Sequence, residues 1–302
     1  MQLQIQTQVR RFYDGGLDAD PSRPEVPPDP NADPQIVLRR LTDAGLEQFA
    51  MDRRIAYRDR HLGELLVPSE TGSFRTDLTS VPALFTWLVP KTGRHLPATL
   101  LHDGLVYEPG TPPTYVSTEG VDVKRAEADR VLRDAMADAG TGVVRRWLVW
   151  SAVTAVTMLS GAGTGEPRGR RWYYRCVVAG TVLLIALLGA CATLDLFDVS
   201  VRWLPQLPWM GDRAWWQELI GGFAGTVVVP GVLGLLWGRF RIAGWIIGIS
   251  LAVLLHVTLV LLVLTAGYQS AEWLARKAPV VAVAGAYAAV VASVVVFIAL
   301  VV

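Results

Sequence analysis

The chain has 302 residues, a length that allows two domains. Its formal net charge of +1 excludes a broadly basic surface, so no nucleic-acid partner is expected. Most of its charged residues precede Cys176, and the mean hydropathy of +0.35 therefore averages a polar first half and an apolar second half.

Short strands and one helix are expected at the beginning of the chain. Residues 2–12 alternate weakly between polar and apolar, as an edge strand does, and residues 20–34 are a Pro- and Asp-rich loop. Residues 36–51 have a weak helical periodicity and predict a helix. Residues 54–59 and 63–68 predict a short hairpin that leads the chain to Thr76.

Three helices are predicted next. Pro97 suits the first turn of a helix over residues 97–107. Residues 121–139 carry an apolar stripe at helical spacing, and Gly140 supplies a stop. Residues 143–160 are apolar with interspersed Ser and Thr, which predicts a core or interfacial helix; a membrane span of marginal length is the alternative.

The Gly-rich segment 161–165 is a linker by composition, and a membrane region is expected after it. Four apolar runs are long enough to span a bilayer, and Trp and Tyr residues gather at their ends: 176–194, 219–237, 242–266 and 279–302. We therefore expect a soluble α+β domain over residues 1–165, with short strands and about three helices, followed by an all-α four-helix transmembrane domain over residues 166–302.

The location and assembly of the protein are predicted from loop charge and glycine spacing. More Arg and Lys residues flank the spans on the side of the first domain than on the other side, and residues 1–16 contain no apolar stretch of signal-peptide length. This predicts a multi-pass protein of the cytoplasmic (inner) membrane with a cytoplasmic N-terminal domain and the lipid bilayer as its partner. Glycines four residues apart in the spans allow a homo-oligomer.

Polar residues in otherwise apolar segments mark the candidate site. One group lies in residues 76–82. His102 and Asp103 lie on the predicted helix over residues 97–107, and Asp129 lies on the predicted helix over residues 121–139. Asp129 could accept a hydrogen bond from the His102 imidazole and fix its tautomer. Asp77 and Asp103 could hold a hard cation through oxygen ligands. The alternative is a structural polar network that joins two helices without catalysing a reaction.

The same stretch resembles a phage- and prophage-associated bacterial family known as domain of unknown function 1353. The resemblance rests on a TDxxSxP, HDxxY and AD series, which here reads Thr76-Asp77…Ser80-Val81-Pro82, His102-Asp103…Tyr107 and Ala128-Asp129. Tyr107 lies one position later than that pattern has it. The order of motifs is also similar to the catalytic core of bacterial secreted phospholipase A2, although the disulfides of those enzymes are absent.

The phospholipase resemblance implies a role for each site residue. His102 would be the general base, and Asp129 would hold its imidazole. Calcium would be the cofactor, bound by Asp103, Asp77 and the carbonyl of Leu78. Two functions follow from these observations. The first is a membrane-anchored, calcium-dependent lipid or ester hydrolase. The second is a non-enzymatic, phage-derived module that binds a partner and signals or assembles at the membrane.

Overall fold

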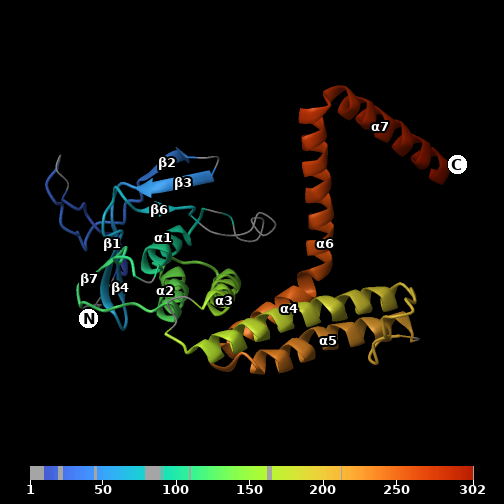
Figure 1. Ribbon diagram of the computed structural model, residues 1–302, viewed down its shortest axis with the longest axis horizontal. Coiled ribbons are helices and arrows are strands. Elements are labelled where there is room, and N and C mark those ends of the chain that lie inside the picture. Colours follow the sequence, from blue (N-terminus) through green and yellow to red (C-terminus); the bar gives the residue numbers. More distant parts are fainter. Residues whose placement is uncertain are drawn as a thin grey trace, which may run out of the picture. The chain divides into compact units, whose positions relative to one another are not determined.

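The computed structural model describes residues 10–19, 23–43, 46–78, 90, 92–108, 110–161, 165–211 and 213–301. The chain forms two compact units, residues 1–253 and 254–302, and their boundary lies inside one long helix. The first unit contains both sheets and the helices α1 to α5 (Figure 1). The candidate site therefore belongs entirely to the first unit.

The larger sheet is antiparallel and has the strand order β1-β4-β5-β7. Its strands are β1 (Phe12–Asp14), β4 (Ile55–Asp59), β5 (Gly63–Val67) and β7 (Val116–Ser117). The predicted hairpin is confirmed as β4 and β5, which pair from Ile55–Val67 to Asp59–Gly63. The edge strand expected over residues 2–12 falls mostly outside the described residues, and the described edge strand begins at Phe12.

The smaller sheet corrects one prediction. Residues 36–51 do not form a helix; they contain β2 (Leu38–Asp43) and β3 (Leu46–Met51), which pair along their whole length. β3 also pairs with β6 (Arg75–Thr76) at Phe49 and Ala50, so this part of β3 has strands on both sides. Tertiary pairing of this kind outweighs a weak local helical period. The pairing of Phe49 with Thr76 also fixes the position of Thr76, the first residue of the candidate site.

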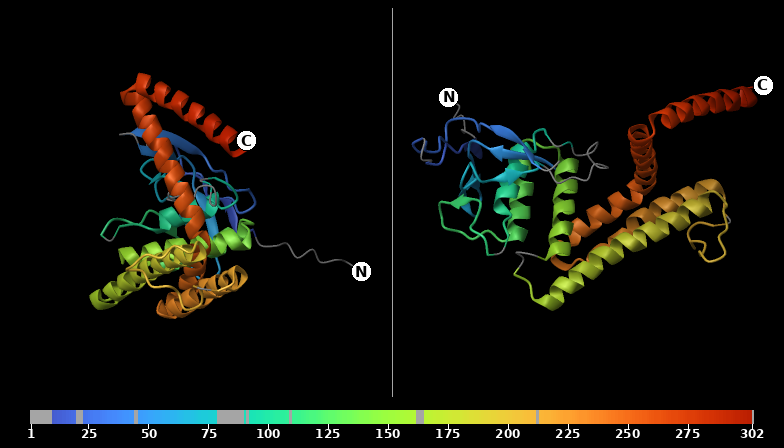
Figure 2. Two further views of the ribbon diagram at one scale, coloured as in Figure 1. Left: turned by 90° about the vertical axis from the view of Figure 1, so that its right-hand side faces the viewer. Right: turned by 45° about the horizontal axis from the view of Figure 1, so that its top comes forward.

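The three predicted helices are confirmed as α1 (Leu96–Leu105), α2 (Arg125–Asp138) and α3 (Val143–Ser160). They pack in sequence, α1 on α2 and α2 on α3, and lie along one side of the sheets (Figure 2). The stripes predicted to face the core are buried, including Leu101 on α1 and Leu132 on α2. The third helix ends where Gly161 adopts a left-handed conformation at φ 64°, which glycine adopts without steric cost.

The remaining helices of the first unit are α4 (Arg168–Leu196), α5 (Trp215–Leu235), the short η2 (Gly238–Phe240) and the beginning of α6 (Arg241–Lys277). α3 packs on α4, and a shared apolar cluster includes Met158, Tyr174 and Trp237. The Trp237 indole is fully buried and donates to Thr181 Oγ1 at 3.1 Å. Independent folding of residues 1–165 stays a prediction, and the packing of Met158 in this cluster bears directly on it.

Two of the glycines in the predicted spans allow close packing within the chain itself. A Cβ on Gly244 would lie 2.5 Å from Trp237, and a Cβ on Gly248 would lie 2.7 Å from Pro230. These distances are shorter than any real carbon contact, so the helices approach here only because glycine has no side chain. Homo-oligomerisation through the Gly-rich spans stays a prediction.

The second unit contains the remainder of α6 and α7 (Pro279–Val301). Within the described part of the chain, three helices are long and apolar enough to cross a membrane: α4, α5 and residues Pro279–Ile298 of α7. The apolar run 242–266 lies in α6, where the side chains of residues 255–263 are outside the description. Three of the four expected spans thus have the length and composition required, and the fourth stays a prediction.

Candidate functional site

The site residues are brought together by one strand and two helices. Thr76 ends β6, His102 and Asp103 lie in the last turns of α1, and Asp129 lies in the second turn of α2. α1 and α2 pack directly against each other, because each buries an apolar stripe against the same core. The polar residues beside these stripes are therefore carried into the helix interface.

His102 and Asp129 are in direct contact, which confirms the predicted pairing. The His102 Nε2 lies 3.0 Å from Asp129 Oδ1, a normal hydrogen-bond length. Both residues are buried, and Asp129 is only 1% exposed. The contact engages Nε2, so Nδ1 is the ring nitrogen that remains for proton transfer. The other carboxylate oxygen of Asp129 is also buried and has no hydrogen-bond partner among the described residues.

Thr76 holds Asp103 through a hydrogen bond. The Thr76 hydroxyl donates to Asp103 Oδ2 at 2.6 Å and accepts the Leu78 backbone N–H at 2.9 Å. Burial and, to a smaller extent, the nearby Asp77 carboxylate raise the pKa of Asp103, which is about 6. The Thr76 hydrogen bond and the proximity of His102 act in the opposite direction. The carboxyl group is therefore ionised less readily than an ordinary aspartate.

The residues expected to hold calcium have features that fit a cation. Asp77 and Asp103 lie close enough for mutual repulsion, which a bound cation would relieve. Leu78 adopts a left-handed backbone conformation at φ 72°, uncommon for a residue with a side chain. Within the described residues, however, no group of three or more His, Cys, Asp or Glu side chains is placed to hold a metal. Calcium takes six to eight oxygen ligands. The described residues thus supply only part of the ligands that calcium takes, and calcium binding stays a prediction.

The remaining motif residues are only partly placed. Ser80, Val81 and Pro82 lie outside the described residues. The structure does not bring Tyr107 to His102 as a partner, because its hydroxyl donates to Asp122 at 2.6 Å. The Thr76–Asp103 bond could not be predicted from the sequence, since a threonine at a strand end most often bonds to its own backbone.

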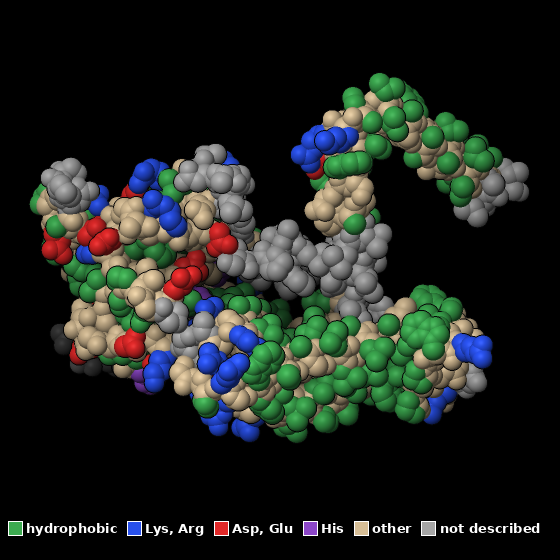
Figure 3. Space-filling model, viewed as in Figure 1, with side chains coloured by type: hydrophobic (Ala, Val, Ile, Leu, Met, Phe, Trp, Pro, Cys, Tyr) green, Lys and Arg blue, Asp and Glu red, His purple; other side chains and the backbone are tan. Residues whose placement is uncertain are grey.

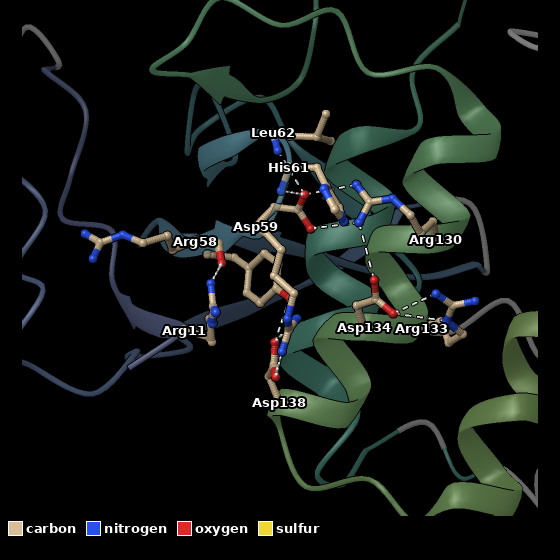
Figure 4. Close-up of polar contacts among 11 residues, drawn as sticks. Arg11, Arg58, Asp59, His61, Leu62, Arg130, Arg133, Asp134 and Asp138 are labelled. Atoms are coloured by element: carbon tan, nitrogen blue, oxygen red, sulfur yellow. Dashed lines mark hydrogen bonds and ion pairs between the residues drawn. The ribbon is translucent and has the colours of Figure 1, made fainter. Parts of the chain in front are cut away.

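A second polar cluster lies nearby and was not anticipated. Asp59 at the end of β4 accepts both terminal nitrogens of Arg130 on α2, at 3.1 and 2.9 Å (Figure 4). It also accepts the backbone N–H groups of His61 and Leu62. Burial opposes its ionisation, but these hydrogen bonds and the Arg130 charge outweigh that effect and lower the pKa of Asp59. Asp59 and Arg130 form an ion pair that fastens the larger sheet to α2.

Residues 49–153 match the model of a family described as Protein of unknown function (DUF1353). The match begins within β3, extends into α3 and contains every site residue. This part of the chain is a DUF1353 domain. No curated protein and no solved structure matches the chain. The family assignment confirms the resemblance seen in the sequence and assigns no activity.

Proposed function

We propose that the protein is a membrane-anchored hydrolase that cleaves lipid or other ester bonds with His102 as its general base. The observation that carries the proposal is the 3.0 Å contact of His102 Nε2 with a buried Asp129. A buried carboxylate on one ring nitrogen fixes the tautomer and leaves the other nitrogen basic. This is the arrangement that a water-activating histidine requires.

In the proposed reaction, Nδ1 of His102 accepts a proton from a water molecule as the water oxygen attacks the ester carbonyl. Asp129 accepts the hydrogen bond from Nε2 and stabilises the imidazolium that forms. The proton then passes from Nδ1 to the leaving alkoxide, which departs as an alcohol and leaves a carboxylic acid. His102 returns to its neutral state at the end of each turnover.

Calcium is proposed as the cofactor on the basis of the Asp77–Asp103 pair. Both carboxylates and the Leu78 carbonyl would hold the ion, and Thr76 would keep Asp103 in place through its hydroxyl. A calcium ion bound there would supply positive charge to stabilise the oxyanion of the ester. Ionisation of Asp103 would become easier beside a cation, since its pKa is raised by burial and by a neighbouring carboxylate.

A lipid substrate and a cytoplasmic-membrane location are proposed from the apolar helices. Three described helices are long enough to span a bilayer, and a hydrolase anchored in this way meets its substrate at the membrane surface. The Arg residues at the beginnings of α4 and α6 and in η2 favour a cytoplasmic position for the DUF1353 domain.

The second candidate function is a non-enzymatic membrane-anchored module that binds a partner, signals or assembles. One observation favours it: the His102 side chain is only 11% exposed. A histidine buried to that extent can equally serve as a structural link between two helices.

The full chain, purified in neutral detergent with short-chain phospholipid, tests the two functions. Calcium-dependent release of fatty acid supports the hydrolase, and His102→Gln should reduce it by about 10²–10⁴-fold. His61→Gln is the matched control, because His61 is exposed and lies outside the site. Turnover that survives in His102→Gln would contradict the role of His102 as general base. Complete absence of turnover from the wild type with calcium present would favour the non-enzymatic module.

A further inference from the structure

Six arginines gather at one end of the helical bundle formed by α4 and α5. Lys and Arg side chains cluster at this end, whereas apolar side chains cover most of the visible bundle surface (Figure 3). We name this group the arginine collar, and its members lie at the beginnings of α4 and α6 and in η2: Arg168, Arg170, Arg171, Arg175, Arg239 and Arg241.

The collar has a large excess of positive charge. Glu166 is the single acidic residue in the sequence segments 161–176 and 236–245, which contain the whole collar. It pairs with Arg170 at 3.1 Å and with Arg239 at 3.0 Å. One carboxylate therefore faces six guanidinium groups, and an anion from outside the chain would find uncompensated charge.

A small pocket lies within the collar. Arg171, Arg239 and Glu166 line it together with Tyr174, Met158 and Phe240. The Nε of Arg171 is buried there and has no hydrogen-bond partner among the described residues. A buried, unpartnered guanidinium nitrogen is costly. A phosphate oxygen would satisfy it, and guanidinium groups bind phosphate through two parallel hydrogen bonds.

The surroundings of the collar match the headgroup region of a bilayer. Trp172 and Tyr173 are about half exposed beside it, and the Arg175 guanidinium lies 5.5 Å from the centre of the Trp172 ring. Tryptophan and tyrosine are enriched where a span leaves the hydrocarbon. Farther along the helices, apolar side chains such as Leu183 and Phe223 are exposed and would contact lipid tails.

We propose that the arginine collar binds the phosphate of an anionic phospholipid, with Arg171 and Arg239 as its principal contacts. Clusters of four to eight basic residues next to a span are attracted to anionic lipid in general. Arg171 and Arg239 both line the pocket, so the two principal contacts lie together on the collar. The inference depends on the membrane anchor and is independent of any hydrolytic activity.

Thermal unfolding of the full chain in neutral detergent tests the collar. Phosphatidylglycerol should raise Tm by a few degrees, phosphatidylcholine should not, and rising NaCl should weaken the effect. The double variant Arg171→Gln/Arg239→Gln should lose at least tenfold in apparent affinity for phosphatidylglycerol. The control Arg202→Gln/Arg213→Gln removes the same charge from the loop at the other end of α4 and α5, and it should bind like the wild type.

Three results would overturn the proposal. They are an equal Tm rise with both lipids, an equal rise with inorganic phosphate at the same concentration, and equal losses in the two double variants. If Arg171→Gln/Arg239→Gln does not fold, Arg168→Gln/Arg241→Gln replaces it, because both residues are exposed. That variant should lose severalfold in affinity, and unchanged affinity would contradict the collar.

Discussion

Two aspartates, the buried Asp59 and the partly buried Asp103, have opposite electrostatic surroundings in the same domain. Asp59 has an arginine and two backbone amides as partners, and its pKa is lowered. Asp103 has one hydroxyl donor and a second carboxylate nearby, and its pKa is raised to about 6. Pairing with a fixed cation makes Asp59 a structural residue. Asp103 has no such pairing among the described residues, which is the condition of a carboxylate that binds an ion or takes part in a reaction.

The largest effect on stability is expected from removing the carboxylate of Asp59. Asp59→Ala should lower the free energy of unfolding by about 3–5 kcal/mol, because it leaves Arg130 and two amides without their buried acceptor. Chemical denaturation measures this loss. The control is Asp52→Ala, which breaks the exposed pair with Arg39 and should cost at most about 1 kcal/mol. Equal losses in the two variants would remove the distinction between a buried and an exposed pair.

Replacing Asp103 should have a smaller effect of opposite sign, an increase in the free energy of unfolding. Its folded pKa is above the usual value, so the folded state holds the proton more tightly and stability falls as pH rises from about 4 to 6. Asp103→Asn cannot ionise, and above pH 6 it should be more stable than the wild type by about 3 kcal/mol. The difference should vanish near pH 4.

Denaturation curves at pH 4 and pH 7.5 measure that difference, and added calcium should narrow it at pH 7.5. A variant that is less stable than the wild type at both pH values would show that Asp103 is a structural carboxylate like Asp59.

The smallest effect is expected at Thr76. Thr76→Val keeps the shape of the side chain but removes the donor to Asp103 and the acceptor of the Leu78 amide, which should cost about 1–3 kcal/mol. The pKa of Asp103 should rise further, because the lost bond favoured its ionised form. Thr118→Val, at an exposed position, should be close to neutral in the same denaturation assay. If the two variants behave alike, the Thr76 hydroxyl has no role in holding Asp103.

The sequence predicted what depends on local pattern. The helix over residues 143–160 was predicted to the residue, because an apolar run ends at a glycine. The contact of His102 with Asp129 followed from two amphipathic helices, each with a polar residue beside its apolar stripe. The β2–β3 hairpin was predicted wrongly as a helix, because its pairing with β6 depends on residues distant in the sequence.

Side-chain pairs between distant segments were missed for the same reason. The side-chain partners of Asp59 and Asp138 are 71 to 81 residues away, and Arg and Tyr residues of ordinary appearance supply them. Nothing in their local sequence distinguishes Asp59, which has a guanidinium partner, from Asp103, which has a hydroxyl. Only the packing of α2 against the larger sheet brings Arg130 to Asp59.

The tautomer of His102 tests the central claim, that Nδ1 is the basic nitrogen of a histidine oriented by Asp129. The measurement is the ¹⁵N NMR spectrum of the histidine-labelled full chain in detergent at alkaline pH, with His102→Gln for assignment. The structure predicts that the neutral ring carries its proton on Nε2, and that Asp129→Asn weakens this preference. A neutral His102 ring protonated on Nδ1 would have its basic nitrogen at Nε2, beside Asp129, and this would contradict the proposed mechanism.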